Sequence, residues 1–145
     1  MIAKEALKID AGSAKAHRNL GDALASQGAL DRAIDELRQA VQLEPADGPA
    51  RYDLGSILLE AGKLDQAITE FQAALELTPN SAEVHNNLGI ALASQGKLAE
   101  AIGHFHEALR IQPGQGDARR NLALALQSRK QRENPPTSAP ALPAR

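Results

Sequence analysis

The stretch HNNLGIALASQG, from His85 to Gly96, decides how this chain folds, because its residues recur along the sequence. HRNLGDALASQG runs from His17 to Gly28, and a looser copy, RYDLGSILLEAG, runs from Arg51 to Gly62. Each copy begins 34 residues after the one before it. A fixed period of this length is typical of proteins that stack supersecondary units into an array.

The composition limits what kind of core the chain can form. At 145 residues it has room for one domain, and its only aromatic residues are Tyr52, Phe71 and Phe105. Such a core consists of small aliphatic side chains, which favours closely packed helices over sheets. Cysteine is absent, which excludes disulfides and thiolate metal sites. No apolar run is long enough to cross a membrane and the first residues do not resemble a signal peptide, so we expect a cytoplasmic protein without membrane contact.

Three units without gaps, residues 14–47, 48–81 and 82–115, divide the central sequence. Each unit carries two apolar stripes at helical spacing, which predicts two helices per unit. In the second unit the stripes are Leu54, Gly55 and Leu58, then Ala67, Ile68, Phe71, Ala74 and Leu75. Glycine is expected to end each first helix and proline each second helix. These residues are Gly28, Gly62 and Gly96, and Pro45, Pro79 and Pro113.

This order of residues, Leu-Gly, then Ala, then Leu or Phe, another Ala and finally Pro, resembles the tetratricopeptide repeat. The resemblance implies an all-α fold, a right-handed superhelical α-solenoid of antiparallel helix pairs. It also implies that Gly21, Gly55 and Gly89 let the two helices of a unit touch, opposite Ala33, Ala67 and Ala101. The family's usual Trp and Tyr are replaced, which makes the core lighter. The replacing residues are His17, Arg51 and His85, and Leu24, Leu58 and Leu92.

Both ends of the chain depart from complete units. Residues 1–13 are similar to the second half of a unit, so Ile2 to Ile9 are expected to form the second helix of a truncated preceding repeat. Its apolar side then meets either further repeats upstream or a partner, including another copy of the chain. Residues 116–132 keep the pattern of a first helix and are expected to cap the array. Residues 133–145 hold four prolines and are expected to be a disordered tail.

The inner surface of such a solenoid is lined by the first helices, so its character follows from the residues that share a place in successive units. The sixth place is occupied by Asn19, Asp53, Asn87 and Asn121. An amide offers one acceptor and two donors, which complement an extended peptide backbone. This column resembles the asparagine ladder that holds peptide main chain in the repeats of O-linked N-acetylglucosamine transferases. Alternatively, duplication preserved amides that bond neighbouring helices, and the two roles are compatible.

The columns beside the ladder predict a groove that is charged at its start and apolar at its end. The fifth place is occupied by Arg18, Tyr52, Asn86 and Arg120. The ninth place is occupied by Asp22, Ser56, Ile90 and Leu124. Ile90 and Leu124 are expected to seat an aliphatic side chain of a bound peptide, unless the tail simply buries Leu124.

The carboxylate clamp of the family, which binds chaperone C-termini, is not expected in this chain. The matching places should hold Lys and Asn, then Asn, then Lys and Arg. They hold Arg18 and Asp22, then Asp53, then Glu83 and Asn87. The acidic balance of residues 14–113 also disfavours nucleic acid as a partner.

No group of residues predicts catalysis, a cofactor or a metal site. His104 and His106 are two residues apart on an expected helix, so they point to different sides, and we expect solvated surface histidines instead of a metal site. No serine has a recognisable base beside it. We expect a non-enzymatic module that binds an extended peptide of another protein in its groove. Two alternatives stay open: a structural spacer or assembly element, and the repeat region of a larger protein such as a glycosyltransferase.

Overall fold

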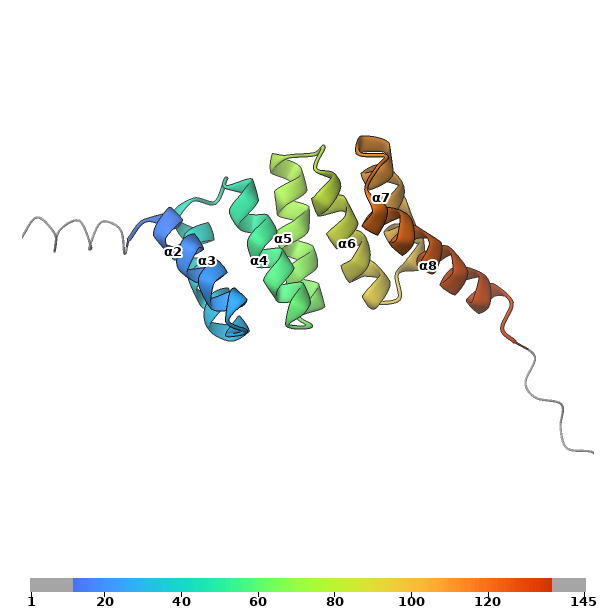
Figure 1. Cartoon of the computed structure of the whole chain (residues 1–145), viewed down its shortest axis with the longest axis horizontal. Coiled ribbons are helices and arrows are strands. Elements are labelled where there is room, and N and C mark those ends of the chain that lie inside the picture. The colour runs from blue at the N-terminus through green and yellow to red at the C-terminus, as the bar shows by residue number, and fades with distance from the viewer. Residues whose placement is uncertain (1–11, 137–145) are drawn as a thin grey trace, which may run out of the picture.

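The computed structural model describes residues 12–136, which form seven helices and, within that range, no strand. The predicted all-α solenoid of antiparallel helix pairs is confirmed (Figure 1). The helices are α2 (Ala14–Ser26), α3 (Leu30–Leu43), α4 (Gly48–Glu60), α5 (Leu64–Leu77), α6 (Ala82–Ser94), α7 (Leu98–Ile111) and α8 (Gly116–Glu133). The pairs α2–α3, α4–α5 and α6–α7 each fall within one predicted unit. The expected cap corresponds to α8, which ends one residue later than expected.

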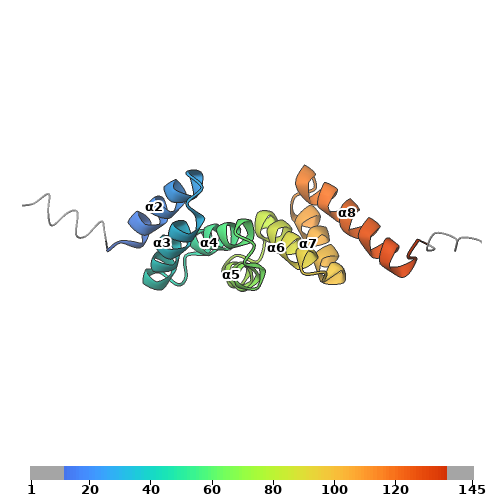
Figure 2. The same cartoon turned by 90° about the horizontal axis from the view of Figure 1, so that it is seen from below.

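The helices form two layers that follow an arc (Figure 2). The first helices α2, α4 and α6 lie on the inner side of the arc, and α3, α5 and α7 lie on its outer side. Helix α8 closes the end of the array and contacts both α7 and α6. Side chains that share a place on the first helices therefore follow one another along the inner surface.

Glycine ends each first helix for a reason visible in the backbone. Gly28, Gly62 and Gly96 have φ angles of 80°, 76° and 84°, a region that other residues rarely adopt. This turn lets the next amide bond back into the helix, as Lys97 N donates to Leu92 O at 2.9 Å. In the fourth unit the same place holds Lys130, and α8 continues past it to Glu133.

The first helices of the three complete units also share an N-terminal cap. The side chains of Ser13, Asp47 and Ser81 accept hydrogen bonds from backbone amides three residues ahead, at 3.0, 3.1 and 3.3 Å. Such caps satisfy amides that have no partner within the helix. Gln115 occupies this place before α8 and makes no capping hydrogen bond with its side chain.

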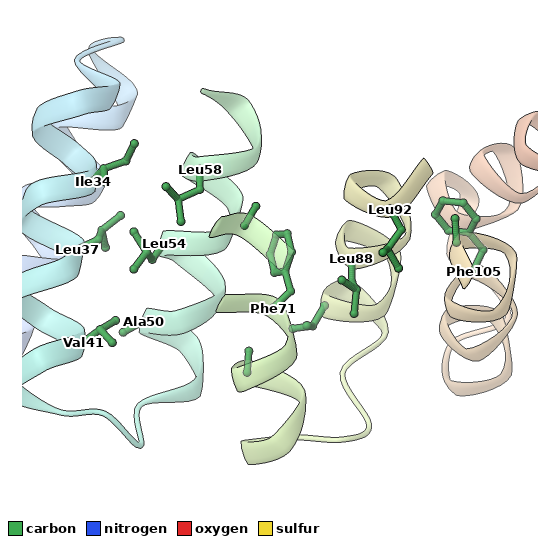
Figure 3. Close-up of a cluster of buried hydrophobic side chains, with 14 of the residues drawn as sticks. Ile34, Leu37, Val41, Ala50, Leu54, Leu58, Phe71, Leu88, Leu92 and Phe105 are labelled. Atoms are coloured by element: carbon green, nitrogen blue, oxygen red, sulfur yellow. The ribbon is translucent and has the colours of Figure 1, made fainter. Parts of the chain in front are cut away.

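The core lies between the two layers and consists mainly of leucine and alanine with two phenylalanines (Figure 3). A Cβ atom added to Gly89 would lie 2.5 Å from Phe105 Cε1, and one added to Gly55 would lie 2.7 Å from Phe71 Cε1. The corresponding contact of Gly21 is Leu37 Cγ, also at 2.7 Å. The glycines therefore make room mainly for these large side chains. At Gly21 the backbone oxygen of Ala33 also lies 3.3 Å from the added Cβ, as the expected placement opposite this alanine requires.

In the three complete units, the first-unit equivalent of the stripe residue Leu54 is exposed instead of buried. Leu20 is 47% exposed, although its equivalents Leu54 and Leu88 are buried. In the later units a preceding second helix packs on this side of the first helix, and none of the described elements precedes α2. The predictions for Ile2 to Ile9 and for most of residues 133–145 concern segments outside the described residues.

Candidate functional site

The predicted columns lie on the inner surface and are joined to each other by hydrogen bonds. A fifth-place side chain of one unit contacts the sixth-place side chain of the next unit, 35 residues later. Arg18 Nε donates to Asp53 Oδ2 at 2.7 Å, and Asn87 Nδ2 donates to the Tyr52 hydroxyl at 3.1 Å. Asn121 Nδ2 then donates to Asn86 Oδ1 at 3.0 Å, and Asn86 is itself buried. These three interunit bonds connect α2, α4, α6 and α8 in order.

The interunit bonds use only part of the capacity of the ladder amides. Asn87 and Asn121 each spend one N–H on the neighbouring helix, so each keeps a second N–H and its carbonyl oxygen. Both side chains are half-buried rather than enclosed. The amides therefore bond neighbouring helices, as the alternative interpretation held, and each retains an N–H and a carbonyl oxygen that these bonds do not use.

The first residue of the sixth-place column and the last residue of the fifth-place column take no part in the interunit bonds. Asn19 is exposed at the start of the array, where none of the described helices precedes it to supply a fifth-place partner. Arg120 is exposed on α8 and reaches Asp117 of the same helix at 3.2 Å, in an ion pair that is largely solvated. The predicted ladder amides that bond a neighbouring helix therefore lie on α6 and α8.

Ile90 and Leu124 meet in an apolar pocket between α6 and α8. The pocket has a volume of about 260 Å³, and Asn121 lies at its edge. Phe105 and Ala125 also line it. Leu124 is 57% exposed, and the alternative that the tail buries it concerns residues that lie mostly outside the described range. Two residues chosen from different repeats are thereby brought to one cavity beside a ladder amide.

A second, polar pocket of about 230 Å³ lies beside the first, between the N-terminal parts of α6 and α8 and Tyr52 of α4. Asn86, Asn87, Glu83, Gln115 and Asp117 complete its lining. The Gln115 Oε1 atom is buried and has no hydrogen-bond partner. The pocket therefore presents two carboxylates, of which Asp117 also pairs with Arg120, a set that favours a cation or an N–H donor.

A third pocket, of about 330 Å³, extends the inner surface towards α2 and contains both charges of the first interunit bond, Arg18 and Asp53. The hydrogen bond to Asp53 raises the pKa of Arg18. Burial, and then the charge of Asp53, raises the pKa of Asp22 on the same face. Tyr52 and Glu83 line this pocket as well as the polar one, so the two adjoin.

Three residues of the polar pocket did not emerge as site candidates from the repeat pattern. Glu83 and Asp117 share the second place of their units, and Gln115 occupies the place of the capping residues. The second-place column changes from Lys15 and Pro49 to these two acids. Comparing that column along the chain would have indicated an acidic end of the groove.

His17 and His85 lie on the side of their first helices that faces the second helices, and neither lines the three pockets. The fourth-place residues His17 and Arg51 bond Glu36 and Glu70 at 2.6 and 3.0 Å. In the third unit His85 Nδ1 instead meets His104 Nδ1 at 3.1 Å. The two ring centroids are 5.3 Å apart and the ring planes are inclined by 29°. A hydrogen bond between the two nitrogens requires that one of them carries the proton and the other accepts it.

Two family models match the chain over these units. The model described as Tetratricopeptide repeat matches residues 52–116, and the model described as TPR repeat matches residues 21–62. The chain belongs to the tetratricopeptide repeat (TPR) family. No curated protein matches it in sequence.

Solved TPR structures superpose on most of the chain. The first TPR domain of Spaghetti (RPAP3) bound to the HSP90 peptide SRMEEVD is 21% identical, with a TM-score of 0.79 over 81% of this chain and 93% of that chain. MamA is 28% identical, with a TM-score of 0.81 over 90% of this chain and 76% of that chain. The Sgt2 TPR domain of Aspergillus fumigatus is 15% identical, with a TM-score of 0.81 over 91% and 90% of the two chains.

Two further observations concern only residues 12–136. None of their helices has both the length and the apolar character that crossing a bilayer requires. Within the same range, no three side chains of the metal-binding types gather closely enough to hold an ion.

Proposed function

We propose that this TPR array is a protein-interaction module that binds an extended peptide along α4, α6 and α8. The observation that carries the proposal is the row of adjoining pockets on the inner surface. The apolar pocket is joined to the polar one by the Asn121–Asn86 bond, and the polar pocket shares Tyr52 and Glu83 with the third. Each pocket has room for one side chain, which suits a peptide more than a folded partner.

The chemistry of the pockets supports a division of roles along the bound peptide. An aliphatic residue fills the space between Ile90 and Leu124, and the free N–H and carbonyl groups of Asn87 and Asn121 hold the backbone. A lysine or arginine of the peptide reaches Glu83 and Asp117 in the polar pocket. The preferred ligand is therefore basic and apolar.

This preference differs from that of the similar structures whose bound peptides end in acidic residues. RPAP3 domains hold the peptides SRMEEVD and SGPTIEEVD from HSP90 and HSP70. In this chain acidic side chains stand at three of the five clamp places, and the one arginine, Arg18, is engaged by Asp53. An acidic C-terminus would meet like charge at Glu83, which disfavours it.

A peptide-display selection followed by titration of the best binder tests this function. We expect selected sequences to pair a basic residue with Leu or Ile, and SRMEEVD to bind more weakly than they do. Replacing both ladder amides, Asn87→Ala with Asn121→Ala, removes neutral hydrogen bonds worth about 0.5–1.5 kcal/mol each, so affinity should fall about tenfold. Gln72→Ala, on the exposed side of α5, is the matched control and should leave affinity unchanged.

The location of the bound peptide is the decisive result. Amide shifts during the titration should move around Asn87, Ile90 and Asn121 on the inner helices. Movement confined to α3, α5 and α7, or selection of acidic peptides, would contradict the proposal. Because Asn121→Ala also removes the bond to Asn86, thermal unfolding of this variant separates a loss of stability from a loss of binding.

A further inference from the structure

Helix α8 is a first helix whose own second helix is missing among residues 12–136. In the three complete units the second helix covers Leu24, Leu58 and Leu92, which are 6%, 1% and 2% exposed. Their equivalent on α8 is Leu126, which is 38% exposed. Ala123, in the place of the three buried glycines, is exposed as well. The face of α8 formed by Ala123 and Leu126 is therefore open, and we call it the end face.

The residues that follow α8 do not carry the pattern of a second helix. Lys130 replaces the glycine that reverses the chain in the other units, and α8 runs on to Glu133. Arg132 holds this extension in place, because its NH1 donates to Gly96 O at 3.0 Å. The later sequence contains Pro135, Pro136, Pro140 and Pro143, and proline removes backbone donors that a helix needs.

The missing pattern occurs at the other end of the sequence, in residues 1–9. Shifted by one period of 34 residues, Ala6 and Leu7 match the buried Ala40 and Val41 of α3. Ile9 matches Leu43, the last residue of that helix. The sequence of residues 1–9 therefore matches the second half of a second helix. The unit that starts at Gly116 lacks such a helix among the described residues.

The sizes of two residues make the end face and this segment complementary. In the complete units a glycine on the first helix faces Leu37, Phe71 or Phe105, and an added Cβ would approach these side chains to 2.7 Å or less. On the end face the glycine has become Ala123, which has that Cβ. The residue of the N-terminal segment that corresponds to Phe105 is Ala3. A second helix with alanine in this place accommodates Ala123, whereas one with phenylalanine collides with it.

We propose that residues 1–9 of one copy pack on the end face of a second copy and complete its fourth unit. Second helices in this solenoid also contact the first helix of the following unit, as α3 contacts α4. The bound segment thus covers the exposed Leu20 of its own copy at the same time. Such a contact joins unlike surfaces, so it extends into open head-to-tail chains instead of closing into a dimer.

The association is weak because only one short segment crosses between copies. An interface of this size lies below the range of stable complexes, and a dissociation constant on the order of 100 µM is expected. Sedimentation velocity of the full chain between about 10 µM and 1 mM should therefore show an average mass that rises steadily with concentration. A protein that remains a monomer throughout overturns the proposal, whether the end face stays open or the chain's own tail covers it.

Two charged variants test the direction of the contact. Leu126→Asp blocks the end face and Leu7→Asp blocks the segment, so each variant alone should be a monomer. An equimolar mixture should form a dimer and nothing larger, because one intact end face meets one intact segment. If Leu7→Asp alone associates, its intact end faces pack against each other. If Leu126→Asp alone associates, its intact N-terminal segments pack against each other. Either result overturns the proposal.

Further variants of the same chain control for folding and test the register. Leu124→Asp places the same charge on α8 but faces the apolar pocket, so it should leave self-association unchanged. Ala3→Phe should weaken association at least tenfold, and adding Ala123→Gly to the same chain should restore it by recreating the Gly89–Phe105 pair. If the double variant remains as weak as Ala3→Phe alone, the proposed register is wrong.

Discussion

The contact between Gly89 and Phe105 allows a quantitative test of how closely the helices of a unit approach. In Gly89→Ala the new Cβ lies 2.5 Å from Phe105 Cε1 and 2.8 Å from Cδ1, so the buried ring has to shift. Overpacking of this kind costs about 1–3 kcal/mol. The change also gains up to about 1 kcal/mol, because alanine favours helix over glycine.

Gly103→Ala on α7 is the matched control, because nothing lies within 4 Å of its added Cβ. It has the gain in helix propensity without the collision, so it should be more stable than the parent. The two alanine variants should therefore differ by about 1–3 kcal/mol in the free energy of unfolding. Thermal unfolding should separate their midpoints by roughly 4–12 °C.

A double-mutant cycle identifies the ring as the cause of the difference. In the background of Phe105→Ala the collision is gone, so Gly89→Ala should become neutral or stabilising. The coupling between the two changes should then be about 1–3 kcal/mol, measured by urea unfolding. Gly89→Ala as stable as Gly103→Ala, or a cycle without coupling, would refute the close approach of α6 and α7.

Three further predictions concern single contacts. Ser81→Ala removes the cap on Val84 N and should lower the free energy of unfolding by about 1 kcal/mol, while Gln115→Ser should add a cap to α8 and slow amide exchange in its first turn. Burial, and then the neighbouring His85, lowers the pKa of His104, so the free energy of unfolding of the parent should fall as the pH drops below the ordinary value of 6.5. His104→Glu gives protonated His85 a carboxylate partner, so this variant should instead be more stable at pH 5 than at pH 7. Urea unfolding at the two pH values measures both differences. Lys130→Gly should end α8 early and release Arg132 from Gly96, seen as faster amide exchange in residues 131–133 with the core unchanged.

The sequence predicted the helices of the complete units well, because the residues that end them act locally. Gly96 needs only its own positive φ to end α6, and a proline such as Pro113 prevents a helix from continuing whatever surrounds it. The buried side chains were also predictable, because apolar residues at helical spacing lie on one side of a helix and that side packs into the core. Leu20 was the exception, because its burial depends on an element before α2.

The contacts of the candidate site were harder to predict, because they depend on how neighbouring units rotate. A column identifies Asn87 and Asn121 as sharing a face, but it does not say which residue of the adjacent helix comes within reach. In the structure this residue is the one at the fifth place of the preceding unit, and only the geometry of the array shows it. The pairing of His85 with His104 has the same origin, since the first two units have glutamate at that place.

The three interunit bonds also determine how the array responds to its solvent. The bond between α2 and α4 is an ion pair, Arg18–Asp53, with both side chains partly exposed, so dissolved salt weakens it. The bonds that the ladder amides donate to Tyr52 and Asn86 involve no charged group and are insensitive to salt. Rising ionic strength should therefore loosen the contact between α2 and α4, whereas the arrangement of α4, α6 and α8 should stay the same.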